Sequence, residues 1–429
     1  SVAVPAGRRE TRMRLLGLEI KRVLWTKMTW ILMCAAVVLS VLMAYIPVTF
    51  NGGRVVNGNG ITVTTELKGL DAVRYYRENS VVQGEVTPEI LQEAIGRYQE
   101  VYAEYNSTYG EDVPAEAYYE RLRPYSPFIR DIKEAFSNRK NGMPPAVGEI
   151  SADEVGNFYL MLNDRLSSIM DMEQGDYPSA KTIALNKFSR VQTPYTYYYG
   201  ASSDSMDYQT IYIFLITILC AVIVASVFST EYQTGADDII RCTKNGRMKI
   251  AIVKIVSAGL ITGILYLLCG ITWIIVTNSL FGWEGTKTSI QILFSATSLL
   301  PYNIGQLQWA NMLGGFLLFL STVSFTLLLS AVAKNNVSAL ALSLVFILLP
   351  VIVYMAVPGQ LGDWIQALLP GAGIGLSNSL LYGMMDFDFL HIGSASFWNT
   401  DVMLVLALVK IPLFLALTVF VYDRKRIRN

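Results

Sequence analysis

Charged side chains are scarce in this sequence of 429 residues. They make up 16% of the chain, whereas hydrophobic residues make up 52% and the mean hydropathy is +0.39. A soluble globular protein carries roughly 25% charged residues. The shortage of charge therefore argues against an ordinary soluble protein and indicates an integral membrane protein, with the lipid bilayer as its first partner. The net charge is zero, and no nucleic-acid partner is expected.

Histidine and cysteine are almost missing, which excludes several kinds of site. The single histidine, His391, has no clustered partners for a zinc site or a Ser-His-Asp triad. The large hydrophilic region contains none of the four cysteines, so neither a disulfide framework nor a CxxC metal motif is available there. No GxxxxGK[ST] loop for nucleotide phosphates occurs. We therefore expect no catalytic residues, no metal and no cofactor bound by this chain itself.

Long apolar runs are what the sequence does have. Crossing the hydrocarbon core takes about 20 residues, and six runs meet that length. They lie at residues 28–48, 208–230, 248–278, 309–333, 337–357 and 401–422. The sequence thus predicts an all-α membrane protein with six transmembrane helices.

The cytoplasmic N-terminal section is placed at residues 1–27. Ser1–Thr11 is expected to be unstructured. Arg12–Trp25 has apolar residues at helical spacing with basic residues between them, which is typical of an amphipathic helix in the membrane interface. The alternative is that this stretch is only the hydrated beginning of the first span.

A large hydrophilic region at residues 49–207 separates the first two spans. Thr87-Pro88-Glu89 is a helix-start pattern, and an apolar-aromatic stripe follows it to Tyr105. Ser151 to Glu154 has the residues of a capping box. We predict a helical domain with further helices at Pro127–Phe136, Ser151–Met172 and Pro178–Phe188. Strand-like alternation is visible only at Ile61–Thr65.

A mixed segment at residues 358–400 precedes the last span. Its two apolar pieces, Trp364–Leu369 and Gly375–Met385, are each too short to cross a membrane. Such pieces indicate re-entrant helices that enter one leaflet and turn back. The alternative is an ordinary loop with buried helices.

Basic residues near span ends predict the orientation, because they favour the cytoplasmic side. They gather in residues 1–27, in residues 231–247, at Lys334 and in the tail 423–429. All of these fall on one side of six spans, so both termini are predicted to be cytoplasmic. The domain at 49–207, with 15 basic and 23 acidic residues, and the loop at 279–308 are then extracellular. A large outer domain without cysteine is typical of a bacterial cell membrane protein.

Two lysines lie inside apolar runs. Lys410 is in the middle of the last span, close to Pro412, where an uncompensated charge would cost about 2.5–3.5 kcal/mol. Together with Pro412 it could line a translocation pathway and meet an anionic substrate group, or it could pair with an acidic partner. The structural alternatives are a bond to a carbonyl that Pro412 frees or extension of the side chain to the headgroups. Lys254 is one turn inside the third span and is expected to extend to the headgroups.

The stretch between the second and third spans carries the most specific pattern. It reads Phe228-Ser-Thr-Glu-Tyr-Gln-Thr-Gly235, followed by a basic turn with Lys244-Asn245-Gly246. Glu231 and Asp238 are seven residues apart, which on one helix would place them on one face, and Ile239 could fill an apolar cleft. The alternative is a solvated loop.

In this stretch and in its overall layout, the chain resembles the permease subunits of ABC-2-type transporters. The resemblance implies that residues 231–247 are a coupling helix that docks into a separate ATPase subunit, which binds ATP and Mg. It marks six residues as contacts with that subunit: Glu231, Gly235, Asp238, Ile239, Arg241 and Lys244. The large domain between the first two spans departs from the many members that have a short loop there.

The resemblance implies an ATP-driven exporter whose pathway forms between two permease copies, or between this chain and a homologue. The cargo would be amphipathic, such as a peptide, a lipid or a drug-like molecule. A different class stays open from the residues alone, namely a membrane receptor or sensor whose helical outer domain binds a ligand.

Overall fold

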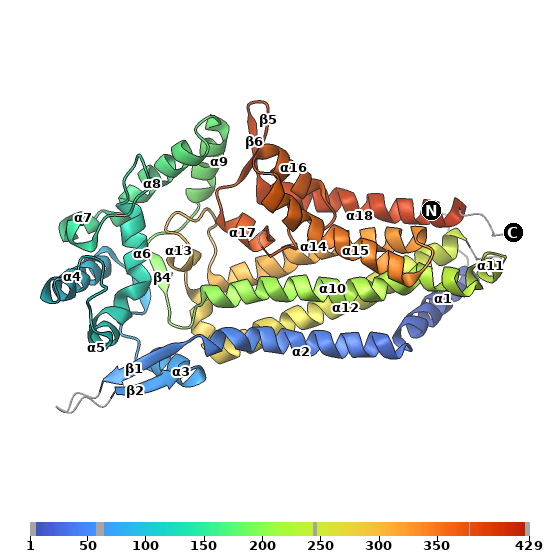
Figure 1. Cartoon of the computed structure of the whole chain (residues 1–429), viewed down its shortest axis with the longest axis horizontal. Helices are drawn as coiled ribbons and strands as arrows, with labels where there is room; N and C mark the ends of the chain where they lie inside the picture. Colours follow the sequence, from blue (N-terminus) through green and yellow to red (C-terminus); the bar gives the residue numbers. More distant parts are fainter. Residues whose placement is uncertain (1–5, 57–63, 243–246, 377, 425–429) are drawn as a thin grey trace.

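Six long apolar helices form the body of the molecule. The computed structural model describes residues 6–56, 64–242, 247–376 and 378–424, and in them six helices are long and apolar enough to cross a membrane. The predicted all-α membrane fold is confirmed. The helices are α2 (Lys27–Thr49), α10 (Ser203–Thr234), α12 (Met248–Phe281), α14 (Ile304–Val332), α15 (Asn336–Ala356) and α18 (Asn399–Arg424). They run along the long axis, with the described ends of the chain at one end of the bundle and the large domain at the other (Figure 1).

The bundle is arranged around α14 and α10. Helix α14 packs against α18 and α10, and α2 packs against α12 and α10. Near the large domain, four buried amide side chains join α10, α12 and α14. Asn278 and Gln308 exchange two hydrogen bonds of 2.8 and 3.0 Å, while the amide of Gln209 donates to the backbone carbonyl of Gln308 and accepts from Asn311. Because the amides satisfy one another, they can be buried without a large desolvation cost.

The large domain is helical, as predicted. Its longer helices are α3 (Leu70–Glu78), α4 (Pro88–Glu104), α6 (Ser126–Ala135), α8 (Phe158–Glu173) and α9 (Pro178–Phe188). Shorter helical turns lie at Ala115–Ala117 (α5), Tyr118–Leu122, Arg123–Tyr125, Val147–Glu149 and Ala152–Val155 (α7). The predicted stripe of α4 is its buried face, where Leu91, Ile95 and Tyr98 lie in the core.

The helix start predicted at Ser151 is confirmed, because Ser151 is the N-cap of α7, but the capping box predicted there is wrong. The Ser151 side chain accepts no hydrogen bond at the beginning of α7, so the expected capping box does not form there. The expected helix Ser151–Met172 is instead divided into α7 and α8, and Gly156 lies between them. A glycine loses more conformational freedom in a helix than other residues do, which favours a break at this point.

Two antiparallel strand pairs complete the domain. Strands β1 (Gly52–Val56) and β2 (Thr64–Lys68) pair with each other, and β3 (Gly84–Val86) pairs with the distant β4 (Tyr195–Tyr197). Of the expected strand-like stretch Ile61–Thr65, the last two residues belong to β2, and the others lie outside the described residues. The pair of β3 and β4 was not predicted, because such short strands leave little alternation in a sequence.

The large domain is hydrogen-bonded to the connection between α12 and α14, which includes turns at Trp283–Lys287 and Ile290–Leu293 (α13). Arg130 of α6 donates to three successive carbonyls of that connection, which belong to residues 291–293. Glu134, one turn further along α6, accepts from the backbone of Ala296 and from two neighbouring hydroxyls. These bonds fix the domain to the bundle through one face of α6.

The segment before the last span contains two short helices and a hairpin. Helices α16 (Gln360–Leu368) and α17 (Leu380–Met385) match the two predicted apolar pieces, and their entry into a bilayer stays a prediction. The hairpin of β5 (Phe389–Ile392) and β6 (Ala395–Trp398) was not predicted. Gly393 has φ +60° in its turn, a conformation that favours glycine.

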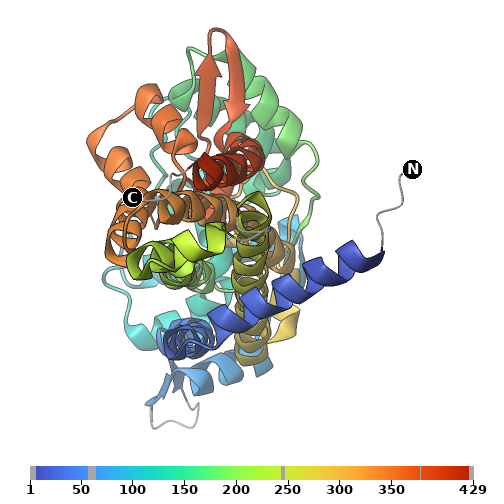
Figure 2. The ribbon, with the colours of Figure 1, turned by 90° about the vertical axis from the view of Figure 1, so that its right-hand side faces the viewer.

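The opposite end of the bundle is crossed by α1 (Ala6–Leu24). The predicted amphipathic helix is present, but it begins at Ala6, so the expectation of an unstructured Ser1–Thr11 is wrong for the described part. Viewed end-on, α1 lies across the ends of the long helices (Figure 2). The short helix α11 (Ala236–Arg241) lies at the same end (Figure 1).

Candidate functional site

The polar stretch between α10 and α12 is divided by Gly235. This residue has φ +74°, in the left-handed region, and serves at once as the C-cap of α10 and the N-cap of α11. A residue with a side chain would be strained in that conformation. The break assigns Glu231 to the last turn of α10 and Asp238 to α11. The expectation that these two acids share one helix face is therefore wrong.

Glu231 is the centre of a buried ion cluster. Its Oε1 atom accepts from Nη1 of Arg22 on α1 at 2.8 Å and lies 2.5 Å from Nζ of Lys254 on α12. Arg22 also bonds Glu19 on its own helix. The carbonyl oxygen of Val227 accepts from both cations, at 3.2 Å from Arg22 and 3.0 Å from Lys254. The cluster thus joins three helices at one point.

The charges of this cluster balance, because it holds two carboxylates and two cations. Lys254 is fully buried and the Glu231 side chain is 7% exposed. Removing one member of such a group leaves an uncompensated buried charge, which typically costs about 3–5 kcal/mol. The expectation that Lys254 extends to the headgroups is wrong, since a carboxylate and a carbonyl bind its ammonium group inside the bundle.

The same turns of α10 also contact α15 and α18. Asn336, the first residue of α15, accepts from Ser229 at 2.6 Å and donates to Thr230 at 3.0 Å. On the α18 side, the ring of Tyr422 lies 5.1 Å from that of Phe228. The end of α10 is therefore connected to α1 and α12 by ion pairs, to α15 by hydrogen bonds and to α18 by aromatic packing.

Beyond the break at Gly235, the chain is more exposed. Ile239 of α11 is 75% exposed. Asp238 is half-buried, and Asp237 beside it is buried. An exposed apolar residue next to polar ones is what a contact surface for another protein needs at its centre.

The six predicted contact residues thus differ in their positions. Glu231 is turned inward and Ile239 is presented outward. Arg241 is the last residue of α11, and Lys244 lies outside the described residues. None of the six is tested as a contact, so their role toward an ATPase subunit stays a prediction.

The environment of Lys410 in the structure differs from those that the sequence predicted. Its Nζ atom donates to the carbonyl oxygens of Ala367 at 3.0 Å and Leu369 at 2.8 Å, at the C-terminal end of α16. A cation at a helix C-terminus satisfies free carbonyls and the helix dipole. The carbonyls come from α16 and not from the turn that Pro412 interrupts. Lys410 therefore anchors α16 against α18, and its place on a translocation pathway stays a prediction.

In the described residues no cluster of His, Cys, Asp and Glu side chains could hold a metal ion. Gly235 joins α11 to the last turn of α10, where Glu231 is bound to Arg22 of α1 and to Lys254 of α12. Sequence reasoning missed Arg22 and Glu19, because nothing in the basic α1 distinguishes them from their charged neighbours. A signal did exist for Lys254, since a lysine in an apolar run needs a partner.

Nearly the whole chain matches a known protein family. The family described as "ABC-2 family transporter protein" matches residues 13–427, and the chain belongs to it. No curated protein matches the chain.

Proposed function

We propose that this ABC-2 family membrane protein is the permease subunit of an ATP-driven exporter. A separate ATPase subunit, which carries ATP and Mg, binds the end of the bundle formed by α1 and α11. Two copies of the chain, or the chain and a homologue, form the pathway between them. The cargo is amphipathic and moves outward across a bacterial cell membrane.

The observation that carries this proposal is the connection from the exposed α11 to the buried ion cluster. Ile239 offers an apolar contact of the kind that forms the centre of a protein interface. Gly235 follows the last turn of α10, where Glu231 is bound to Arg22 of α1 and to Lys254 of α12. A force applied at α11 therefore reaches three helices over a short distance.

The positive charges at this end of the molecule support the proposed orientation. Basic residues of α1, such as Arg14, Lys21 and Arg22, lie at the same end as α11. Basic residues favour the cytoplasmic side, where an ATPase subunit has access to ATP. The large domain is then outside the cell.

The test is whether this chain captures an ABC-type ATPase subunit, for which the product of a neighbouring ATPase gene would be the first candidate. The full chain is co-expressed with that subunit, purified through a tag on the permease, and the ATPase bound per chain is measured. Ile239→Asp places a charge in the proposed apolar contact and should reduce capture about ten-fold or more, as loss of a central interface residue does. Ile392→Asp is the matched control, because Ile392 is 62% exposed in β5, which lies far from α11 (Figure 1).

Equal capture by the Ile239→Asp and Ile392→Asp variants would overturn the assignment of α11 as the contact. If the unaltered chain captures no ATPase subunit at all, the permease proposal itself fails and the receptor alternative gains support.

A further inference from the structure

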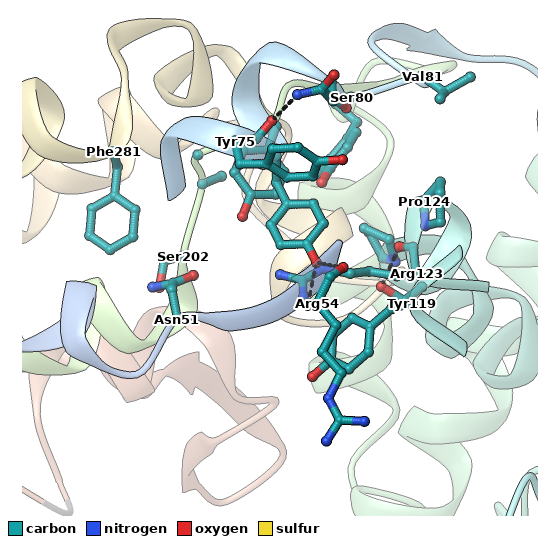
Figure 3. A pocket seen from close by; sticks show the side chains of 18 of the residues that line it. Asn51, Arg54, Tyr75, Ser80, Val81, Tyr119, Arg123, Pro124, Ser202 and Phe281 are labelled. Carbon is teal, nitrogen blue, oxygen red and sulfur yellow. Dashed lines mark hydrogen bonds between the residues drawn. The ribbon is translucent and has the colours of Figure 1, made fainter. Parts of the chain in front are cut away.

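A cavity of about 480 Å³ lies between the large domain and the ends of three spanning helices. Its lining includes Asn51, just after α2, Ser202, just before α10, and Phe281, the last residue of α12. The opposite part of the lining comes from α3 and from the turns around Arg123 (Figure 3). Ligand sites of small molecules commonly have volumes of about 300–1,000 Å³. The cavity is thus large enough for a ligand and lies next to the membrane region.

Arg123 gives the cavity an uncompensated positive charge. One of its nitrogens, Nη1, donates to the Gly52 carbonyl at 2.7 Å, and its guanidinium carbon lies 3.5 Å from the centre of the Tyr76 ring. Among the described residues no carboxylate lies within ion-pair distance of it. Arg54, the other cation of the lining, differs because it pairs with Glu116 at 2.9 Å.

The lining of the cavity has few carboxylates that would repel an anion. Glu120 is the one acidic residue among the described lining residues, and it is exposed. An arginine has five N–H donors in a planar fork that suits a carboxylate or a phosphate. The Gly52 carbonyl and the Tyr199 hydroxyl are both hydrogen-bonding partners of Arg123, and its remaining donors can bind an anionic group.

The walls around this charge are aromatic. Tyr75, Tyr119 and Tyr199 line the cavity together with Phe281, and the centre of the Tyr119 ring lies 5.2 Å from the guanidinium carbon of Arg123 (Figure 3). Aromatic rings combine a large apolar surface with few rotatable bonds, so they bind apolar chains at a small entropic cost. One cavity therefore offers an anion-binding fork and an apolar surface next to each other.

We propose that this cavity binds an anionic amphiphile, a molecule with a phosphate or carboxylate head and an apolar chain. The head binds Arg123, and the chain lies along the tyrosines toward Phe281. A membrane lipid and a soluble fatty-acid-like molecule share this chemistry. The binding needs no ATPase subunit, so this inference stands apart from the proposed transport function.

The test uses the full chain in nanodiscs of phosphatidylcholine, without any ATPase subunit. Dihexanoyl phosphatidate, dodecanoate, dihexanoyl phosphatidylcholine and inorganic phosphate are titrated by calorimetry. Phosphatidate, dodecanoate or both should bind saturably. Binding of phosphatidate alone indicates a membrane lipid, and binding of dodecanoate alone indicates a soluble fatty-acid-like molecule. Arg123→Gln should weaken this binding about ten-fold or more, because it removes a charge-assisted hydrogen bond to the head. Arg97→Gln, at an exposed arginine of α4 outside the cavity, should leave it unchanged.

Equal binding of phosphatidylcholine and both anionic amphiphiles, or equal binding of inorganic phosphate, would overturn the proposal. So would an unchanged affinity in the Arg123→Gln variant.

A second measurement covers the case in which Arg123→Gln does not fold. Ser80→Cys places a thiol on the lining by a small change, and the alkylation of that thiol is followed by mass spectrometry of the peptide. A bound anionic amphiphile should slow this alkylation about ten-fold by shielding the thiol, whereas the exposed Cys242 serves as an internal reference. Alkylation of the introduced thiol at the same rate with and without saturating phosphatidate and dodecanoate would contradict the proposal.

Discussion

The carboxylate of Glu231 and the ammonium group of Lys254 lie 2.5 Å apart at the interface of α10 and α12. Lys254 is fully buried, and Glu231 is nearly so. A lysine in this position is stable in its charged form only because the carboxylate and the Val227 carbonyl bind it. This pair connects the segment before α11 to the third span, and Arg22 extends the connection to α1.

Replacing Lys254 should destabilise the chain more than replacing both members of the pair. Lys254→Met leaves Glu231 with only the partly exposed Arg22, and we expect a loss of about 3–5 kcal/mol. The double variant Lys254→Met/Glu231→Gln removes both charges and should recover part of that loss. Thermal unfolding of the purified chain measures this. Lys27→Met, at an exposed lysine, is the control, and a double variant less stable than Lys254→Met would contradict the prediction.

Gly235 should tolerate asparagine better than alanine. Its left-handed conformation disfavours a side chain, so Gly235→Ala should cost about 1 kcal/mol, while Asn adopts this conformation more readily. Thermal unfolding compares the two variants. Gly259→Ala is the matched control, because Gly259 lies within α12 and, like Gly235, has no atom within 4 Å of an added Cβ. Equal stability of the two Gly235 variants would show that the break does not need the left-handed conformation.

Lys410→Met should loosen α16 while leaving the rest of the bundle in place. The substitution removes the donor for the Ala367 and Leu369 carbonyls, so the last turn of α16 loses its anchor. Hydrogen exchange of residues 360–369 should become faster. Lys334→Met, at an exposed lysine, should not change it. Unchanged exchange in the Lys410→Met variant would contradict the anchoring role and favour a role on the translocation pathway.

Asp131 should make the stability of the large domain depend on pH. Burial raises the pKa of this carboxyl to about 7, although Arg130 beside it acts in the opposite direction. Because the folded-state pKa lies above the unfolded value of 3.8, this group favours the folded state most below about pH 4. Its contribution is lost as the pH rises toward 7.

The Asp131→Asn variant should remove that part of the pH dependence. The unfolding temperature of the unaltered chain and of the variant is measured from about pH 4 to pH 8, and the difference between them should change over this range. Asp112→Asn, at an exposed position, is the control. A constant difference between Asp131→Asn and the unaltered chain would show that Asp131 is ionised throughout.

Several features of the fold could be predicted because they depend on nearby residues. The six spans follow from runs of apolar residues, and α4 and α9 follow from a proline at the helix start and from periodicity. The hairpin of β5 and β6 could not be predicted in this way, since its strands have four residues each. The pairing of β3 with β4 joins segments that lie far apart in the chain.

The candidate site likewise has local features, which a sequence can indicate, and contacts between distant segments, which it cannot. Three features of the site are local: the position of the polar stretch, the break at Gly235 and the exposure of Ile239. Sequence patterns directly indicated the position of the polar stretch. The partners of Glu231 are not local, because they depend on how α1, α10 and α12 are rotated about their axes. A helix places successive residues about 100° apart, so an error of one residue in packing turns a side chain from the interior to the surface.

The amino-acid sequence alone was enough to predict six spanning helices and a polar segment between the second and third of them. Hydrophobic burial and backbone hydrogen bonding within each helix are sufficient for that. The pairing of Glu231 with Arg22 and Lys254, and the bond of Lys410 to the end of α16, became visible only in the folded structure. A buried charge needs a partner, but which partner it finds is set by the packing of helices that are distant in the chain.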